Sequence, residues 1–167
     1  MDVHWDLNLS MYTGTSAVLF TSMGYSTERD NWWDTPEAKK FMAERKSDPS
    51  FDKKVDKKLA EIVRKGGAVI TSYTLPWLVK EEYVIKLWLR GSPENRAKRM
   101  ANRDDISFAE AKRIIALRDE ENKKIYHKLY GFRFGEDLTV FDYVLNTDRL
   151  PLDSLIEISK LIVRRQK

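Results

Sequence analysis

The chain has 167 residues, of which 42% are hydrophobic and 34% are charged, and its formal net charge is +4 at pH 7. This composition excludes a collagen, a disordered tail and a disulfide scaffold, and the length predicts a single domain, 1–167, with its own hydrophobic core. The sequence has no cysteine and two histidines, which excludes thiolate catalysis and sulfur-ligated or all-histidine metal sites, so no metal ligands are predicted. No apolar run approaches the about 18 to 20 residues of a membrane span, and the first residues lack a signal-peptide pattern, so we expect a cytoplasmic protein without membrane partners.

Four short segments have the composition of strands, each apolar without clean alternation, which is typical of parallel strands covered on both faces. They are 7–12, which is the weakest, 68–73, 83–89 and 142–147. Helices are expected at Thr35-Pro36, over 51–65, from Ser92-Pro93 to about residue 102, from Ser107 with Glu110 as a capping box to about Tyr130, and from an Asp153 cap onward. Strands that alternate with helices predict an α/β domain with a mostly parallel sheet.

The stretch 90–118 carries the clearest chemical signal. Arg96, Arg99 and Arg103 lie at i, i+3 and i+7, which places them on one face of an expected helix. Arg113 and Arg118 follow on the next helix, across a short break. Guanidinium groups grip phosphate oxygens bidentately and keep their charge, so two such helices suit a polyphosphate ligand.

A second interpretation of the same stretch needs no ligand. Charged helix faces are common in soluble proteins, and arginines on them pair with neighbouring carboxylates. The carboxylates within reach are those of Glu94, Asp104, Asp105 and Glu110. The charge pattern alone favours this interpretation over a phosphate site.

Six segments together resemble one family of nucleotide kinases in their order and spacing. They are Asp48–Asp56, Gly67–Ile70, Trp88–Arg99, Arg103–Ser107, Arg118–Glu121 and Asp142–Thr147. From about Ser47 to the C-terminus the chain resembles the archaeal-type cytidylate kinases, relatives of adenylate kinase among the P-loop nucleoside monophosphate kinases. Residues 7–14 are more weakly similar to the strand and turn before the family's monophosphate-binding helices.

The resemblance implies a three-layer α/β domain of the P-loop nucleoside monophosphate kinase type, with a mostly parallel sheet. Residues about 13–65 would correspond to the monophosphate-binding region, and about 92–131 to an arginine-rich helical lid with the helix that follows it. ATP and Mg²⁺ would be the cofactors, and CMP or a related nucleotide would be the acceptor.

The resemblance also implies roles for six residues at matching positions. Arg118 would reach the transferring phosphates from the helix after the lid, and Arg99 would stabilise their charge from the lid, so these two would be catalytic. The nucleotide-binding residues would be Arg96 and Arg103, over the donor's phosphates and adenine, and Asn146 and Thr147, near the donor base.

Three features depart from the family. The sequence contains no Gly-x-x-x-x-Gly-Lys-[Ser/Thr] loop, which holds phosphate and magnesium in P-loop kinases. Met1 aligns within the helix after that loop, which predicts a sheet without its usual first, central strand; truncation, a different completion of the sheet, or a strand from a second chain would each account for this. Thr71-Ser72-Tyr73 replaces an acidic-Gly-Arg turn and Val18 replaces an arginine, so the acceptor monophosphate site lacks its two cationic anchors.

The resemblance and these departures leave two candidate functions. The first is ATP-dependent phosphoryl transfer to a nucleotide, and the second is a non-catalytic relative that binds a nucleotide, a protein or RNA. Trp32 and Trp33 lie in a polar stretch and are candidates for a ligand or partner surface. Because the loop and the acceptor-site residues are missing, we expect this chain by itself to be inactive as a kinase.

Overall fold

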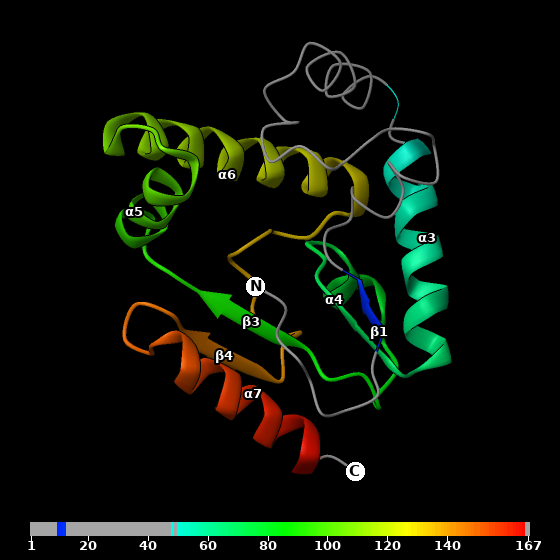
Figure 1. The fold of residues 1–167 in the computed structure, drawn as a ribbon. Coiled ribbons are helices and arrows are strands. Elements are labelled where there is room, and N and C mark those ends of the chain that lie inside the picture. Colours follow the sequence, from blue (N-terminus) through cyan, green and yellow to red (C-terminus); the bar gives the residue numbers. More distant parts are fainter. Residues whose placement is uncertain (1–9, 13–47, 49, 166–167) are drawn as a thin grey trace. The chain divides into compact units, whose positions relative to one another are not determined.

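The computed structural model of the chain describes residues 10–12, 48 and 50–165. They belong to two compact units, one within Met1–Val84 and the other within Ile85–Lys167, and each is described by itself. Figure 1 shows the elements of both units in chain order. The expected helix at Thr35, Val18, and the Trp32–Trp33 pair lie outside the described residues, and the single domain stays a prediction.

The first unit is built on α3 (Ser50–Lys65). The Asp48 carboxylate accepts hydrogen bonds from the Ser50 N–H and hydroxyl, both at 2.8 Å, which satisfies free donors at the start of the helix. The helix ends where the sequence predicts, because Gly66 adopts a left-handed conformation with φ +73°. The lysines at 53, 54, 57 and 58 are exposed, as expected of a solvated face.

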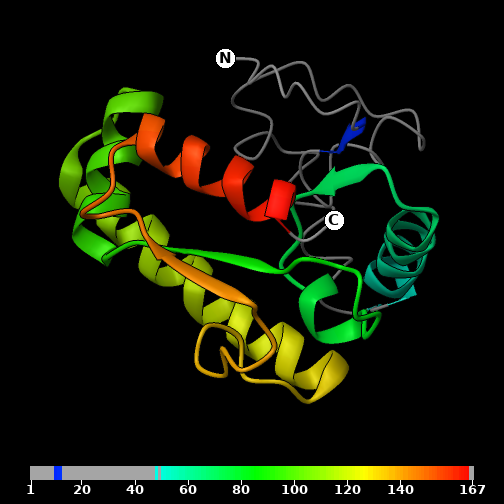
Figure 2. The same ribbon diagram turned by 90° about the horizontal axis from the view of Figure 1, so that it is seen from below.

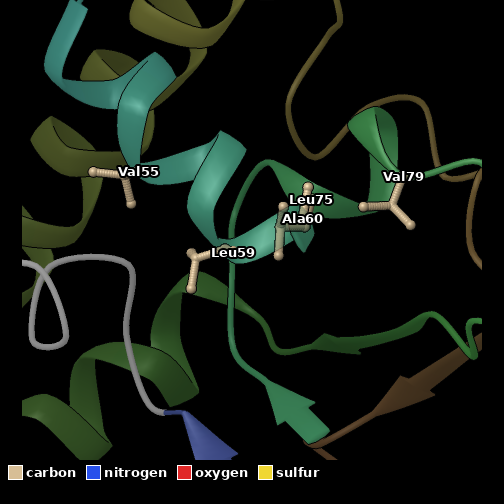
Figure 3. Close-up of a cluster of buried hydrophobic side chains, with 5 residues drawn as sticks. All are labelled: Val55, Leu59, Ala60, Leu75 and Val79. Atoms are coloured by element: carbon tan, nitrogen blue, oxygen red, sulfur yellow. The ribbon is translucent and has the colours of Figure 1, made fainter. Parts of the chain in front are cut away.

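The core of this unit lies between α3 and the short helix α4 (Leu75–Leu78), which the sequence analysis did not anticipate. Figure 3 shows its five buried side chains, those of Val55, Leu59, Ala60, Leu75 and Val79. Full burial of an aliphatic side chain contributes about 2 kcal/mol, so this cluster fixes α4 against α3. α4 also holds in place the residues just before it, 71–74.

The strands of the first unit are parallel, as predicted. β1 (Ser10–Tyr12) pairs with β2 (Ala68–Ile70), with Ser10 opposite Ala68 and Tyr12 opposite Ile70. The predicted strand 68–73 is correct at its start and too long at its end, because the chain leaves the strand at Thr71 to form the turn before α4.

The second unit contains the other parallel pair. β3 (Leu87–Arg90) pairs with β4 (Tyr143–Asn146), from Leu87 opposite Tyr143 to Arg90 opposite Asn146. Figures 1 and 2 show the helix α6 (Phe108–Tyr130) on one side of this pair and α7 (Leu152–Arg165) on the other. The predicted strand 83–89 is wrong at its start, since Tyr83 lies in a turn and belongs to the first unit.

A helical hairpin leaves β3 and returns toward β4. It consists of α5 (Pro93–Asp104) and α6 (Phe108–Tyr130), and Asp105 reverses the chain between them in the left-handed conformation, with φ 51°. The hairpin is closed by the buried side chains of Ala97, Met100, Ala111 and Ile115. The predicted helix starts at Ser92 and Ser107 are confirmed, because each hydroxyl accepts a hydrogen bond from the N–H three residues on.

Two predicted caps need correction. The capping box at Ser107 is half formed, because the Glu110 carboxylate binds Arg113 on its own helix rather than the Ser107 N–H. Asp153 is not a cap, since α7 already begins at Leu152 after Pro151 and places Asp153 within its first turn. The predicted end of α6 is confirmed, with Gly131 left-handed at φ 77°.

Aromatic packing joins the end of α6 to the strands. Phe134 makes edge contacts with Trp88 of β3 and with Tyr126 of α6, at ring-centroid distances of 5.6 and 5.4 Å. Trp88 also packs against Phe141, 5.1 Å away. Trp88 is therefore a packing residue rather than a stacking platform for a base.

Candidate functional site

The polar residues at the carboxyl ends of β3 and β4 form one connected group. The backbone N–H of Thr147 donates to the carbonyl oxygen of Arg90 at 2.7 Å, and the Thr147 hydroxyl donates to the same oxygen at 3.0 Å. Parallel strands place these ends at one edge, which is where open α/β sheets bind ligands. This polar group therefore lies where a ligand-binding site is expected in such a sheet.

Gly91, directly after β3, leaves a notch in this group. A Cβ atom at Gly91 would lie 2.6 Å from Nη2 of Arg99, 2.9 Å from Oγ1 of Thr147 and 3.3 Å from Cγ of Arg96. The first two distances are shorter than any ordinary contact, so side chains of α5 and of Thr147, the residue after β4, occupy the space that a larger residue would need. Gly91 therefore lets Arg99 approach the strand ends.

Asp148 joins the two strand ends from the other side. Its carboxylate oxygens lie 3.1 and 2.9 Å from the Ser92 N–H, which donates to them at the start of α5. This backbone hydrogen bond, with further contributions from Asn95, the Ser92 side chain and the charge of Arg99, lowers the pKa of Asp148. A carboxylate of this chain thus already occupies the start of α5, where an anion is stabilised.

The arginines of the hairpin have very different partners. Arg96 forms a two-pronged ion pair with Asp119 of α6, with N–O distances of 2.7 and 2.8 Å. Arg103 forms such a pair with its neighbour Asp104, and Arg113 with Glu110. Lys112 pairs with Glu94 across the hairpin at 3.2 Å. The carboxylate-paired interpretation of the charged face is thus correct for Arg103 and Arg113, while the partner of Arg96 is one that sequence reasoning did not name.

Arg99 and Arg118 differ from the other arginines. Arg99 is exposed and makes one hydrogen bond, from Nη2 to the Thr147 hydroxyl at 3.3 Å, with no ion pair to a carboxylate in the described part of the chain. Arg118 is also exposed and forms no ion pair with any described residue, although its charge helps to lower the pKa of Asp104, whose main cause is Arg103. Both guanidinium groups keep donors that an anion can use.

The structure brings together some of the expected site residues. Arg99 meets Thr147, and the Asn146 side chain accepts a hydrogen bond from the Asp148 N–H at 2.9 Å beside them. Arg103 is bound to Asp104 at the far end of α5, and among the described residues no hydrogen bond joins Arg118 to Thr147 or Asn146. Sequence reasoning missed Gly91, Asp119 and Asp148 as participants; Asp148 directly follows the end of the predicted strand 142–147, which was an available signal.

The turn after β2 uses its polar groups internally. The Ser72 hydroxyl accepts from the N–H groups of Thr74 and Leu75, both at 3.2 Å, and so caps α4. The Thr74 hydroxyl donates to the Asp56 carboxylate on α3 at 2.5 Å, and both side chains are buried. The side chains that replace the expected charged turn therefore hold α4 on α3.

Two further properties bear on function. Among the described residues, no three carboxylate, histidine or cysteine side chains gather where they could hold a metal ion. None of the helices in the described segments has the length and apolarity that crossing a bilayer requires.

The fold and the site define a class: an α/β protein with parallel strand pairs and an arginine-bearing helical hairpin between two strands. The chain matches the cytidylate kinase-like family over residues 10–149 and belongs to that family. It is 35% identical over 113 residues to a cytidylate kinase of Pyrobaculum aerophilum, an alignment covering 68% of this chain and 61% of the relative. It is also 34% identical over 115 residues to a cytidylate kinase of Pyrococcus horikoshii, covering 69% of this chain and 59% of the relative, and 38% identical over 121 residues to one of Sulfurisphaera tokodaii, covering 71% and 65%.

The match thus spans about three fifths of the length of these curated relatives. The predicted resemblance to archaeal cytidylate kinases is confirmed.

Proposed function

We propose that this chain is a homologue of the cytidylate-type nucleoside monophosphate kinases whose helical hairpin binds the donor nucleotide, ATP, at the carboxyl ends of β3 and β4. The observation that carries the proposal is the exposed guanidinium of Arg99, held beside Gly91 and Thr147 without a carboxylate partner among the described residues. A cation with free donors at the edge of parallel strands is suited to a phosphate group.

The proposed roles follow from these partners. Arg99 and Arg118 contact phosphate oxygens and stabilise the charge that develops during transfer. Arg96 and Arg103 are bound to carboxylates that partly neutralise them, so each would bind the nucleotide through its remaining N–H donors or by exchanging its carboxylate for a phosphate. Asn146 and Thr147 border the place proposed for the donor base.

The described residues offer binding groups for the phosphates of ATP but few for Mg²⁺. The triphosphate has cationic donors in Arg99 and Arg118, and the notch at Gly91 keeps backbone close to the site. Mg²⁺ has no cluster of three ligands among the described residues, so it would be held mainly by the phosphates of ATP and by water. Bound Mg²⁺ would neutralise charge on the transferring phosphate.

These 167 residues alone are proposed to bind the nucleotide without transferring its phosphate. No Gly-x-x-x-x-Gly-Lys-[Ser/Thr] loop occurs in the sequence, and the turn at Thr71–Tyr73 offers no cation for an acceptor phosphate. The described strands form two pairs, β1–β2 and β3–β4, which supports the expectation that the family's first, central strand is not among them. Truncation, a different completion of the sheet, and a strand from a second chain each stay open as the explanation.

The second candidate is a non-catalytic nucleotide-, protein- or RNA-binding module. One observation favours it: the turn after β2 has become a structural joint, with Ser72 capping α4 and Thr74 bound to buried Asp56. Tyr73, in the same turn, is 53% exposed and stands where the family's turn has its arginine. On this proposal the arginine face binds an anion that is not turned over.

Calorimetric titration with ATP and a coupled assay with Mg²⁺, ATP and CMP test the proposal together. We expect ATP binding that is more than tenfold weaker but still measurable in Arg99→Ala and unchanged in Arg133→Ala, an exposed arginine of the loop after α6, and no turnover of CMP, AMP, UMP or dCMP. Absence of ATP binding by the unaltered chain would overturn the site. Turnover that disappears in Arg118→Ala would overturn the non-catalytic candidate, and with it the proposal that these 167 residues alone transfer no phosphate.

A further inference from the structure

Neighbouring arginines of α5 are held in opposite ways. Arg96 shares both of its terminal nitrogens with the Asp119 carboxylate, so its charge is satisfied inside the hairpin. Arg99, one turn further on, is held by one neutral oxygen, that of the Thr147 hydroxyl. A neutral partner fixes a guanidinium without neutralising it, whereas a carboxylate does both.

The Thr147 hydroxyl is suited to holding Arg99 because its own proton is already used in another hydrogen bond. The hydroxyl donates to the carbonyl oxygen of Arg90 at 3.0 Å, and the Thr147 backbone N–H donates to the same carbonyl at 2.7 Å. With its one proton used, the hydroxyl oxygen can only accept, and it accepts from Nη2 of Arg99. The position of the Arg99 guanidinium is thereby tied to the backbone of β3.

Gly91 supplies the space for this contact. The Cβ of any other residue would come within 2.6 Å of the Arg99 nitrogen and 2.9 Å of the Thr147 oxygen. The backbone at Gly91 is not left-handed, so its conformation alone does not require glycine. Lack of a side chain, rather than backbone freedom, is what this position provides.

We infer that Thr147 is a positioning residue, which acts through Arg99 instead of contacting the ligand, and that Gly91 keeps open the notch in which this contact forms. The ligand it serves is the phosphate chain of a nucleoside triphosphate, so the inference rests on the proposed function. A long side chain that is ordered before binding loses less conformational entropy when the anion arrives. The expected gain in affinity is up to about tenfold.

The first test compares two variants at Thr147 in calorimetric titrations with ATP. Thr147→Val keeps the shape and removes the hydroxyl, and we expect about tenfold weaker binding. Thr147→Ser keeps the hydroxyl and should bind within about twofold of the unaltered chain. Thr139→Val makes the same chemical change in the loop 131–142, where the Thr139 hydroxyl donates to Asp137, and should leave binding unchanged.

The second test displaces Arg99 without removing any polar group. In Gly91→Ala the new methyl group meets both the end of the flexible Arg99 side chain and the Thr147 hydroxyl, so the contact between these two groups is forced apart. We expect ATP binding to weaken as in Thr147→Val, with a loss in the free energy of unfolding no larger than that of Thr147→Val. In an Arg99→Ala background, neither Thr147→Val nor Gly91→Ala should weaken binding further. Additive losses would show that Thr147 contacts the nucleotide directly and would overturn the inference.

A third measurement needs no nucleotide. The ¹⁵N–¹H heteronuclear Overhauser effect of the Arg99 Nε–H group, assigned by its loss in Arg99→Ala, reports whether this side chain is ordered. We expect order in the unaltered chain and in Thr147→Ser, and rapid motion in Thr147→Val and Gly91→Ala. Equal motion in all four would overturn the positioning role, whereas an ordered Arg99 in a chain that binds no ATP would overturn the proposed function alone.

Discussion

The turn after β2 and the turns after β3 and β4 occupy equivalent places, at the carboxyl ends of parallel strands, and are used differently. In the first, Thr74 is 3% exposed and its hydroxyl is bound to the buried carboxylate of Asp56. In the second, the Thr147 hydroxyl donates to a carbonyl oxygen and accepts from the exposed Arg99, which forms no ion pair with a described residue. Similar hydroxyl side chains thus serve packing in one unit and the presentation of a cation in the other.

The difference teaches where ligand chemistry can reside in this chain. A polar group that is buried and fully bonded can leave its partner only at a substantial cost in free energy, so it stabilises the fold. A charged group that is exposed and singly bonded can add a ligand at little cost. The carboxyl ends of β3 and β4 meet the second condition, and the turn after β2 meets the first.

The largest effect that would test this contrast is expected at Thr74. Thr74→Val removes a buried donor from the Asp56 carboxylate, and we expect the free energy of unfolding to fall by about 2 kcal/mol. Urea unfolding followed by tryptophan fluorescence measures the change. ATP affinity of the folded chain should stay within about twofold of the unaltered value, because the turn after β2 lies outside the proposed site.

Thr74→Ser is the matched control for this change. It keeps the hydroxyl and loses a methyl group, so it should cost about 1 kcal/mol, less than Thr74→Val. A Thr74→Val variant with normal stability and weakened ATP binding would reverse the contrast and make the turn after β2 part of the ligand site.

Much of the second unit could be predicted from its sequence, because its elements begin and end on local signals. Ser92 and Ser107 cap the helices α5 and α6 with their own hydroxyls, and Gly131 ends α6 in the left-handed conformation. The parallel pairing of β3 with β4 followed from their unbroken apolar composition and from the helices between them. Such features depend on neighbours within a few residues.

Features that depend on distant neighbours were not predictable in the same way. Arg96 has carboxylates closer in sequence than Asp119, yet it binds Asp119, because packing of Ala97 and Met100 against α6 sets which side chains meet. The four-residue helix α4 is too short to show a periodic pattern, and its place depends on contacts with α3. The apolar run that begins at Tyr83 predicts a strand, but Tyr83 lies in a turn. There its hydroxyl donates to the carbonyl oxygen of the distant residue Arg64 at 3.3 Å.

A smaller effect is expected at Asp119, and it sharpens the contrast between Arg96 and Arg99. Asp119→Asn removes the charge that binds Arg96, and both side chains are partly exposed, 37% for Arg96 and 31% for Asp119. We therefore expect a loss of about 1 kcal/mol in the free energy of unfolding. The same variant should not weaken ATP binding, since it frees the Arg96 guanidinium.

Glu110→Gln provides the comparison for Asp119→Asn. Glu110 also binds an arginine through both carboxylate oxygens, but Arg113 lies on the same helix and the pair is more exposed, so its loss should lower the free energy of unfolding less than Asp119→Asn does. Equal costs for the two variants would show that the Arg96–Asp119 pair does not bind α5 to α6. Weaker ATP binding in Asp119→Asn would place Asp119 itself in the site.

The smallest effect is expected in the pH dependence of stability, and it tests whether Asp148 joins the strand ends in its ionised form. The Ser92 N–H lowers the pKa of Asp148 in the folded chain, so its contribution to stability is present above the unfolded pKa and is lost as the pH falls through the lower folded pKa. That window begins below about pH 4. The melting temperature of Asp148→Asn should therefore lie below that of the unaltered chain at pH 7, and the difference should shrink toward pH 3.

Asp105→Asn separates this effect from the general titration of carboxylates. Asp105 is exposed and left-handed, a conformation that asparagine also adopts readily, so its difference from the unaltered chain should be small at both pH values. A difference for Asp148→Asn that stays constant from pH 7 to pH 3 would mean that the carboxylate charge does not hold the start of α5 to the end of β4. In that case the start of α5 would be open to an outside anion, and ATP should bind Asp148→Asn more tightly than the unaltered chain at neutral pH.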